Sequence, residues 1–206
     1  MGLDDEEVVR QYLQGVYNTI LVKDIVRRLN VRNVPFLENL IRYVGDNIGK
    51  PLSATNIQNY MTSNKNEVSK NLVLKYLKAT VEAFLVHSVT RYNLHGKKLL
   101  ESNDKYAIER EESQASLNFP ECEHTRPKAK YYYGDVGLRN FIVGGRRASD
   151  IEKIVENLVY QHLLRQGYKV TVGQMYATEI DFVATKGDST IYVQASYQIG
   201  RASCRE

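Results

Sequence analysis

Residues 179–197 read EIDFVATKGDSTIYVQASY, and this stretch decides the fold of the C-terminal half. Apolar residues alternate with polar ones through two runs, as in strands with one buried face. The residues between the runs, Lys186-Gly187-Asp188, are a signal for a tight hairpin turn. A similar run lies just upstream. We therefore predict three strands, at Lys169–Val172, Ile180–Ala184 and Thr190–Tyr197, the last of them at an exposed sheet edge.

A helix is predicted before these strands. Ser149 is a good N-cap, and Glu152 completes a capping box three residues later. Gly167 is a natural residue to end the helix. The apolar side chains between these signals recur at helical spacing, so we expect one side of the helix to be buried. That side comprises Ile151, Ile154, Val155, Leu158, Val159, His162 and Leu163.

A helix followed by three strands is the minimal core of restriction-endonuclease-like enzymes. In such a core an acid from the helix and two acids from adjacent strands hold Mg²⁺ through oxygen ligands. A lysine in an E-x-K pattern helps to orient the attacking water. Residues i and i+2 of a strand point to the same face, so the second strand acid and the lysine meet one phosphate.

Three positions in this chain correspond to that pattern. Glu156 fits the helix acid and Asp181 the first strand acid, while Gln194 and Ser196 stand where E-x-K would be. Gln194 lacks the charge that makes a hard divalent cation bind well, and Ser196 supplies no cation. We therefore expect a degenerate catalytic set of Glu156, Asp181 and Gln194, with Mg²⁺ held weakly or not at all by Glu156 and Asp181.

Two other interpretations stay open. In one, the chain is an active Mg²⁺-dependent nuclease that uses Glu156, Glu179 and Asp181, with Lys169 or another basic group in place of the missing lysine. Mg²⁺ is expected as a cofactor only in this case. In the other, the acids are solvent-side residues of a helix and an edge strand.

Upstream, residues 35–106 have the pattern of a compact helical unit. Pro35 begins a helix that Gly49-Lys50-Pro51 stops. Ser53 caps a short helix and Ser69 a third one. The third helix has an apolar stripe at helical spacing, which consists of Leu74, Leu77, Val81 and Phe84.

After the third helix the pattern becomes a hairpin. A strand is predicted over 85–92 and a hairpin tip over 93–98, followed by a returning strand. This order of elements is that of a winged helix-turn-helix, in which the third helix enters the major groove and the hairpin touches the backbone. Residues 35–106 hold ten Lys or Arg and six Asp or Glu, which gives the whole net charge of +4.

The side chains suited to nucleic-acid contact are therefore predicted on the third helix and the hairpin tip. They are Asn71, Lys75, Lys78, Lys97 and Lys98. A solvated helix face, or a winged helix that serves as a protein-interaction module, explains the same residues.

The remaining segments complete the organisation. Residues 1–34 form a helical connector, with five acids and five bases. Residues 107–130 are a polar insertion or disordered loop, 131–199 form the truncated nuclease-like domain, and 200–206 are a non-native tail. The 206 residues are 43% hydrophobic, without a run of the roughly 20 apolar residues that a membrane helix needs. We expect a cytoplasmic protein without a membrane partner.

Five stretches resemble the C-terminal region of a prokaryotic family of AAA-type ATPases. They are Tyr131 to Asn140, Glu156 to Tyr160, Gly167 to Val170, Glu179 to Ala184 and Tyr192 to Tyr197. The stretch Tyr17 to Ile25 is similar to the family's link between ATPase and winged helix. The resemblance implies a P-loop ATPase domain, a winged helix, and a domain of unknown function with a degenerate restriction-endonuclease-like fold.

The ATPase domain itself is expected to be absent from this chain. Its best candidate for a phosphate loop, Gly45 to Pro51, is one residue short and has Pro51 where Ser or Thr would hold Mg²⁺. The chain is then a C-terminal fragment that binds no cofactor, and ATP belongs to the missing domain. Its expected partners are DNA and that ATPase domain.

The leading hypothesis is thus a non-catalytic nucleic-acid-binding or regulatory module of α+β fold, made of a winged helix and a decayed nuclease-like domain. The alternatives are the Mg²⁺-dependent nuclease and a protein-interaction platform that binds no DNA.

Overall fold

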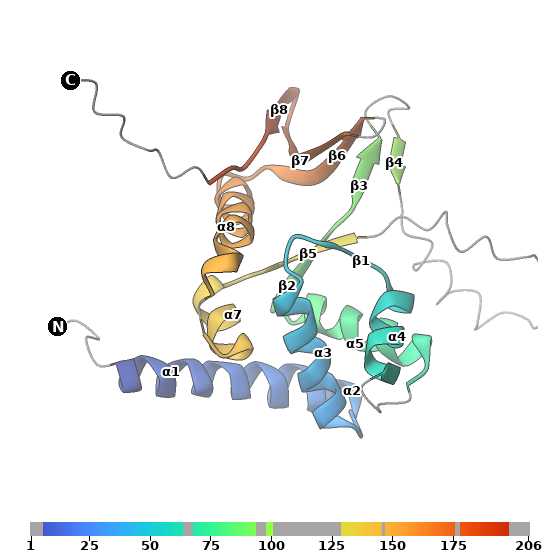
Figure 1. Cartoon of the computed structure of the whole chain (residues 1–206), viewed down its shortest axis with the longest axis vertical. Helices are drawn as coiled ribbons and strands as arrows, with labels where there is room; N and C mark the ends of the chain where they lie inside the picture. Colours follow the sequence, from blue (N-terminus) through green and yellow to red (C-terminus); the bar gives the residue numbers. More distant parts are fainter. Residues whose placement is uncertain are drawn as a thin grey trace, which may run out of the picture.

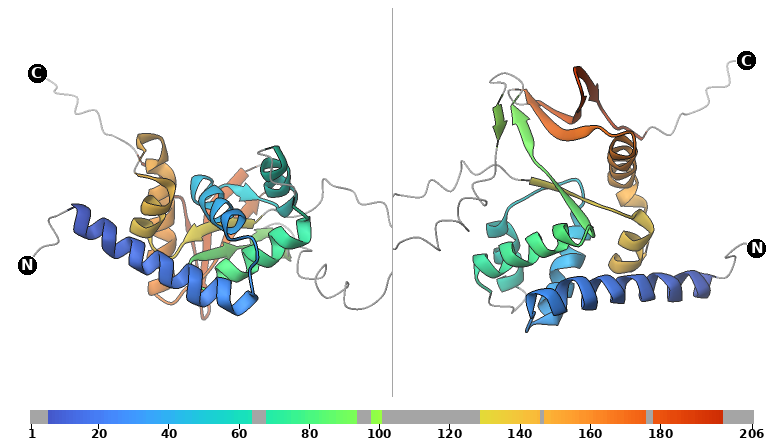
Figure 2. Two further views of the ribbon diagram at one scale, coloured as in Figure 1. Left: turned by 90° about the horizontal axis from the view of Figure 1, so that it is seen from below. Right: turned by 180° about the vertical axis from the view of Figure 1, so that it is seen from behind.

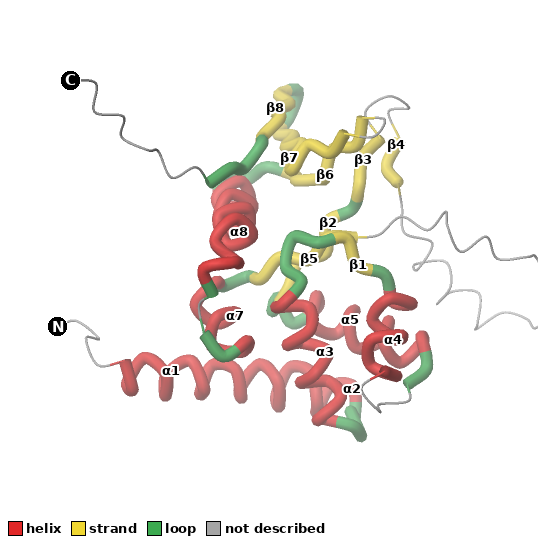
Figure 3. The backbone as a smooth tube through the Cα atoms, viewed as in Figure 1, coloured by secondary structure: helices red, strands yellow, loops and turns green. Residues whose placement is uncertain are grey.

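A computed structural model of the chain describes residues 6–63, 68–93, 98–100, 129–145, 147–175 and 178–197. Most helices gather at one end of the molecule and two small sheets at the other, which confirms the predicted α+β class (Figures 1 and 3). One hydrophobic cluster joins the two ends. Among the described helices, none has both the length and the apolar character to cross a bilayer.

A long helix crosses the underside of the molecule (Figure 2). It runs without a break through α1 (Glu6–Thr19), a π-helical stretch (Ile20–Val26) and α2 (Arg27–Leu29). Apolar side chains at a spacing of four residues, such as Leu21 and Ile25, bury one stripe of it against the core. The helix ends where Asn30 takes a left-handed conformation.

Three shorter helices stack above it, and each begins where the sequence carries a capping signal. These are α3 (Val34–Asp46), α4 (Ala54–Ser63) and α5 (Lys70–Glu82). The hydroxyl of Ser53 accepts a hydrogen bond from the Asn56 amide at 3.1 Å, and that of Ser69 accepts from the Leu72 amide at 3.2 Å. Both predicted caps are confirmed, because capping depends only on residues within one turn.

The predicted apolar stripe of α5 is wrong at its end. Leu74 and Leu77 are buried, but Phe84 is 76% exposed. The helix ends at Glu82, and Phe84 takes a left-handed φ of +56°. The next amide, that of Leu85, then bonds to Thr80 O at 3.1 Å, and Leu85 enters the core instead.

The first sheet has the order β1-β5-β2. Its strands are β1 (Pro51–Leu52), β2 (Val86–Val89) and β5 (Ala129–Tyr133), all antiparallel. The central strand β5 is buried along its whole length. Its residues were predicted to end an insertion and to begin the nuclease-like domain, yet they pair with strands of the upstream helical unit. Pairing between strands so distant in sequence leaves no local signal.

The second sheet has the order β4-β3-β6-β7-β8. The strand predicted over 85–92 is divided at Thr90 into β2 and β3, and a hairpin forms between β3 (Arg91–Asn93) and β4 (Lys98–Leu100). Strand β3 also pairs in parallel with β6 (Lys169–Met175), so the hairpin belongs to the C-terminal sheet (Figure 1). The predicted domain boundaries stay a prediction, but strand pairing crosses them in both sheets.

The turn between β7 (Thr178–Lys186) and β8 (Ser189–Val193) confirms the predicted hairpin signal. Gly187 has a φ of +56°, and Lys186 pairs with Ser189. The prediction of a strand over 190–197 is wrong at its end, because β8 stops at Val193. Gln194 and Ser196 therefore follow the strand instead of lying within it.

Helix α7 (Val136–Val143) was not predicted. The Asp135 carboxylate caps it by accepting from the Leu138 amide at 2.5 Å. Gly144, with a φ of +83°, ends it. Eight residues are too short for the periodic pattern that identified the longer helices.

Helix α8 (Ile151–Arg165) was predicted, but with the wrong start, and its buried side is confirmed only in part, at Ile154 and Leu163. Ser149 lies in a short 3-10 turn, Ala148–Asp150, and does not cap α8. Gly167, with a φ of +81°, follows the helix end as predicted. Leu158 is 49% exposed, whereas Asn157 and Gln161 are buried.

The physical reason for this rotation is the end of β5. The Asn157 amide group donates to Tyr133 O at 3.0 Å and accepts from Tyr133 N at 2.7 Å, while Gln161 donates to the same oxygen at 3.0 Å. Unpaired backbone groups are costly when buried, so α8 turns its amide side chains inward to satisfy them.

Candidate functional site

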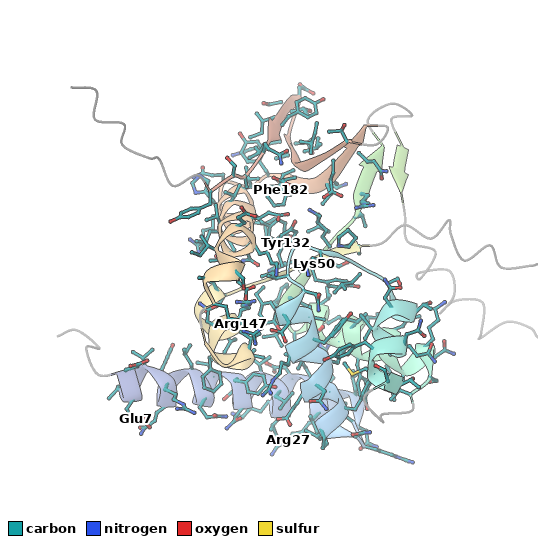
Figure 4. The ribbon with its side chains drawn as sticks, viewed as in Figure 1. Glu7, Arg27, Lys50, Tyr132, Arg147 and Phe182 are labelled. Carbon is teal, nitrogen blue, oxygen red and sulfur yellow. The ribbon has the colours of Figure 1, made fainter. Side chains whose placement is uncertain are left out.

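The candidate site is a set of charged side chains between the two sheets, which we call the ion cluster. It consists of Arg91, Lys130, Tyr132, Glu156 and Glu179. They come from β3, β5, α8 and β7. Figure 4 shows Tyr132 between the helical end and the upper sheet.

Lys130 is the centre of the ion cluster. Its ammonium nitrogen is 2.9 Å from Glu156 Oε1 and 2.7 Å from Glu179 Oε1, and Lys130 is only 3% exposed. The Tyr132 hydroxyl donates to Glu156 Oε1 at 2.6 Å. Arg91 pairs with the other oxygen of Glu179. Lys130 and Tyr132 are two residues apart, so both point to the same face of β5.

A β-bulge directs Glu179 into the ion cluster. Thr171 pairs with Val183 and Gly173 with Ile180, so two residues of β7, Asp181 and Phe182, lie opposite the single residue Val172 of β6. The extra residue reverses the alternation of the strand before it. Glu179 therefore reaches the side of the sheet that faces β5.

Two opposing effects set the charge of Lys130. Burial lowers the pKa of its ammonium, but hydrogen bonds and charges from Glu179 and Glu156 outweigh burial and raise that pKa overall. Burial, followed by the charge of Glu156, raises the pKa of the Tyr132 hydroxyl. Lys130 is thus a cation and Tyr132 a neutral donor at physiological pH.

An aromatic layer lies under the ion cluster. The Tyr132 ring stacks on Tyr160 with centroids 4.7 Å apart and contacts Phe182 at 5.4 Å. His87 packs against Tyr160 at 5.7 Å, and burial lowers the pKa of its imidazole. These rings exclude water from beneath the charges, which strengthens the ion pairs.

The turn after α3 closes over Glu156. A β-carbon at Gly49 would lie 2.9 Å from Glu156 Oε2, and Gly49 has a φ of +72°. Only glycine fits both constraints. The segment Gly45 to Pro51 contains the end of a helix, as predicted, and it presents its backbone to a carboxylate.

Asp181 and Gln194 are hydrogen-bonded to each other at a place outside the ion cluster. Asp181 Oδ2 accepts from the Ala195 amide at 2.8 Å, and Gln194 Oε1 accepts from the Asp181 amide at 3.4 Å. Asp181 contributes to the raised pKa of Tyr132, so its charge acts on the ion cluster. Within the described parts of the chain, no three His, Cys, Asp or Glu side chains are grouped to hold a metal ion.

Sequence reasoning missed three members of the ion cluster, namely Arg91, Lys130 and Tyr132. The available signal was the spacing of Lys130 and Tyr132 in a strand-like run. Lys169, named as a substitute for the catalytic lysine, is exposed at the start of β6. The cation beside the two acids is Lys130 instead.

The predicted nucleic-acid face is exposed on α5. Asn71, Lys75 and Lys78 share one side of the helix with Glu82. Lys78 Nζ is 4.0 Å from Glu82 Oε1. Lys97 lies outside the described residues, and Lys98 begins β4 with a side chain that is likewise outside the description.

A second buried ion network fixes the helices next to the site. Arg139 is fully buried, with its guanidinium 2.8 Å from Asp150 Oδ2 and 2.9 Å from the carbonyl of Gly45. Burial raises the pKa of Asp150, but hydrogen bonds from Arg139 and Lys153 outweigh burial and lower that pKa overall. Since every charge has a partner inside the protein, this network is structural.

Two proteins described as uncharacterized are similar to the chain. One, from Haemophilus influenzae, is 31% identical over 195 residues, which are 95% of this chain and 42% of that protein. The other, from Methanocaldococcus jannaschii, is 20% identical over 205 residues, or 98% of this chain and 40% of that protein. The chain therefore spans about two-fifths of the length of these relatives. No solved structure matches it.

The family pattern described as a domain of unknown function (DUF8612) matches residues 3–108. This range covers the long N-terminal helix, the three stacked helices and the β3–β4 hairpin. Because the match extends over half of the 206 residues, the chain belongs to the DUF8612 family.

Proposed function

We propose that this chain is a non-catalytic nucleic-acid-binding module. The observation that carries the proposal is the buried Lys130 between Glu156 and Glu179. A divalent cation needs carboxylates whose charge is free to balance it. In this protein two internal cations, Lys130 and Arg91, already balance both acids, and the burial of Lys130 keeps its ammonium from a substrate phosphate.

The topology supports a winged helix as the binding unit. Helix α3 is followed by β1, then by α4 and α5, and by strands β2 and β5 in a sheet of order β1-β5-β2. This is the arrangement in which the third helix, here α5, contacts the major groove. Its exposed Lys75 and Lys78 are suited to phosphate.

A decayed nuclease core accounts for the C-terminal part. Helix α8 is followed by β6, β7 and β8, and Glu156 and Asp181 occupy the helix and strand positions. The charges of both reach Tyr132. On this proposal the protein keeps the fold of the nuclease, and the positive charge of Lys130 takes the place of the metal ion.

The two relatives are longer than this chain, and a further domain attached to the module would account for their extra length. On the resemblance to AAA-type ATPases, we propose that a P-loop ATPase is the partner of this module and that ATP binds there. Such a protein would work in the cytoplasm of a prokaryotic cell.

Binding is tested with a fluorescent duplex of random sequence. Lys75→Glu and Lys78→Glu should each weaken binding about tenfold and flatten its salt dependence, because each removes a phosphate contact. Lys169→Glu makes the same charge change on β6 and should bind like the parent. If the parent and the three variants bind the duplex equally well, α5 is not part of the nucleic-acid interface.

Cutting is tested with supercoiled plasmid and Mg²⁺ or Mn²⁺. The proposal expects the plasmid to stay intact at high protein concentration. Metal-dependent nicking that Asp181→Ala abolishes would establish the nuclease alternative instead.

One observation favours a protein-interaction platform as a second candidate function. A groove of about 490 Å³ between α1 and the end of α5 is lined mostly by apolar side chains. Tyr12 and Phe84 at this groove are 65% and 76% exposed. If the parent protein binds no nucleic acid, this groove is the surface to examine, by measuring whether Phe84→Ser changes its association with the rest of the longer protein.

A further inference from the structure

The charges of the long N-terminal helix are separated along its length. Glu6 and Glu7 lie in the first turn of α1, whereas Arg27 and Arg28 lie in α2. Figure 4 shows Glu7 and Arg27 at opposite ends of this helix. Residues 1–34 have equal numbers of acids and bases, so their net charge conceals a basic end.

The fold places this basic end beside α5. Arg28 Nη2 is 2.6 Å from Glu82 Oε2, and Lys78 Nζ is 4.0 Å from the other oxygen of Glu82. Glu82 is the last residue of α5. Arg28 of α2 therefore adjoins the end of the helix that exposes Lys75 and Lys78.

Helix stability explains only part of this arrangement. Basic residues in a last turn interact favourably with the helix dipole, which accounts for Arg27 and Arg28. Arg32 is exposed beyond Asn30, the left-handed residue that ends the helix, so the dipole does not account for it. The dipole also does not explain why the basic end lies next to a second basic helix.

We infer that Arg27, Arg28 and Arg32 extend the surface of Lys75 and Lys78, and that a nucleic-acid backbone runs over both helices. This inference rests on the proposed function and adds to it a second phosphate-binding element.

The composition of this surface favours nucleic acid over an acidic protein. Within residues 20–32 and 70–82 the acids are Asp24 and Glu82, both exposed, so positive charge prevails along these two segments. Among the described residues, the large exposed hydrophobic side chains lie outside α2 and α5 themselves, with Val22 and Phe84 flanking them. A protein interface needs an apolar centre, whereas phosphates need only cations and hydrogen-bond donors.

The sharpest test is a gain of affinity through Glu82→Gln. This change removes the acid that holds Arg28 and Lys78, so both cations become available to phosphate. Binding of a fluorescent duplex should tighten about threefold in low salt and become more salt-dependent. Unchanged or weaker binding would overturn the inference.

A loss of affinity tests the arginines directly. Arg27→Gln/Arg32→Gln should reduce the slope of log K against log salt by about 2, one unit for each phosphate contact removed. The control Arg10→Gln/Arg165→Gln removes the same charge from exposed positions on α1 and α8 and should keep the parental slope.

The outcomes separate this inference from the proposed function. If Lys75→Glu weakens binding but the α2 double variant does not, the module binds nucleic acid and the inference fails. If the parent does not bind the duplex, the proposed function fails with it. If polyglutamate competes as well as unlabelled duplex, the surface recognises acidic protein, and the choice of nucleic acid is wrong.

Discussion

The ammonium of Lys130 is held by carboxylates from α8 and β7, so a single side chain connects three elements. Lys130→Met would leave Glu156 without a cation and Glu179 with Arg91 alone. We expect the free energy of unfolding to fall by roughly 3–5 kcal/mol, the usual cost of breaking a buried ion pair. Urea denaturation at pH 7 measures this loss.

The control is Lys169→Met, which changes an exposed lysine and should alter stability by less than about 0.5 kcal/mol. In the double variant Lys130→Met/Glu156→Gln, part of the loss should be recovered, because the carboxylate that lost its cation is gone. Equal stability of Lys130→Met and its control would mean that the ion cluster contributes nothing.

Two glycines should respond to alanine in opposite directions. Gly49→Ala forces a β-carbon against Glu156 and a side chain into a left-handed φ, so it should destabilise the protein by about 1–3 kcal/mol. Gly15→Ala lies within α1 with open space around it and should stabilise by up to about 1 kcal/mol. Thermal unfolding compares them, and a stable Gly49→Ala would contradict the close approach to Glu156.

His87 should make stability depend on pH. Burial lowers its pKa below 6.5 in the folded protein, so the unfolded chain binds more protons as the pH falls through 6.5. The free energy of unfolding should therefore decrease between pH 7.5 and 5, and the decrease should stop below the folded pKa. His87→Phe keeps the ring beside Tyr160 and removes this contribution. Identical pH profiles of parent and variant would refute it.

Among the elements, α8 and β5 depend on each other through Asn157. Its amide satisfies both backbone groups of Tyr133, where β5 leaves the sheet. Asn157→Leu would bury an unpaired N–H and should cost about 1–3 kcal/mol. The exposed neighbour Leu158 provides the control, because Leu158→Asn should cost far less. Chemical denaturation measures the free energy of unfolding of both variants, and Asn157→Leu should lose more of it than Leu158→Asn.

The elements also show which predictions a sequence supports. The caps at Ser53 and Ser69 and the turn at Gly187 were predicted correctly, because each depends on residues close in the chain. The buried side of α8 was predicted only in part, since the backbone of Tyr133, more than twenty residues upstream, draws Asn157 and Gln161 inward. The β-bulge that directs Glu179 into the ion cluster could not be predicted from the sequence either, because it exists only in the pairing of β6 with β7. Of the predicted site residues, Glu156 lies in the ion cluster and Asp181 outside it, whereas Lys130 was assigned to a loop.

At the scale of the whole molecule, the helical end and the C-terminal sheet are joined by the strands themselves. The chain passes from β2 in one sheet to β3 in the other within two residues, and the ion cluster spans both. We propose that a nucleic acid bound at α5 is sensed by the C-terminal sheet through this connection. On our proposal, that connection is how the module reports binding to an attached ATPase.

The most direct test of this account follows one labelled duplex in one reaction. The duplex is incubated with the parent protein and Mg²⁺, its anisotropy is recorded, and its length is then read on a denaturing gel. We predict a salt-sensitive rise in anisotropy with a duplex of unchanged length. Shortened strands, or an anisotropy that never rises, would contradict the claim that this protein holds nucleic acid without cutting it.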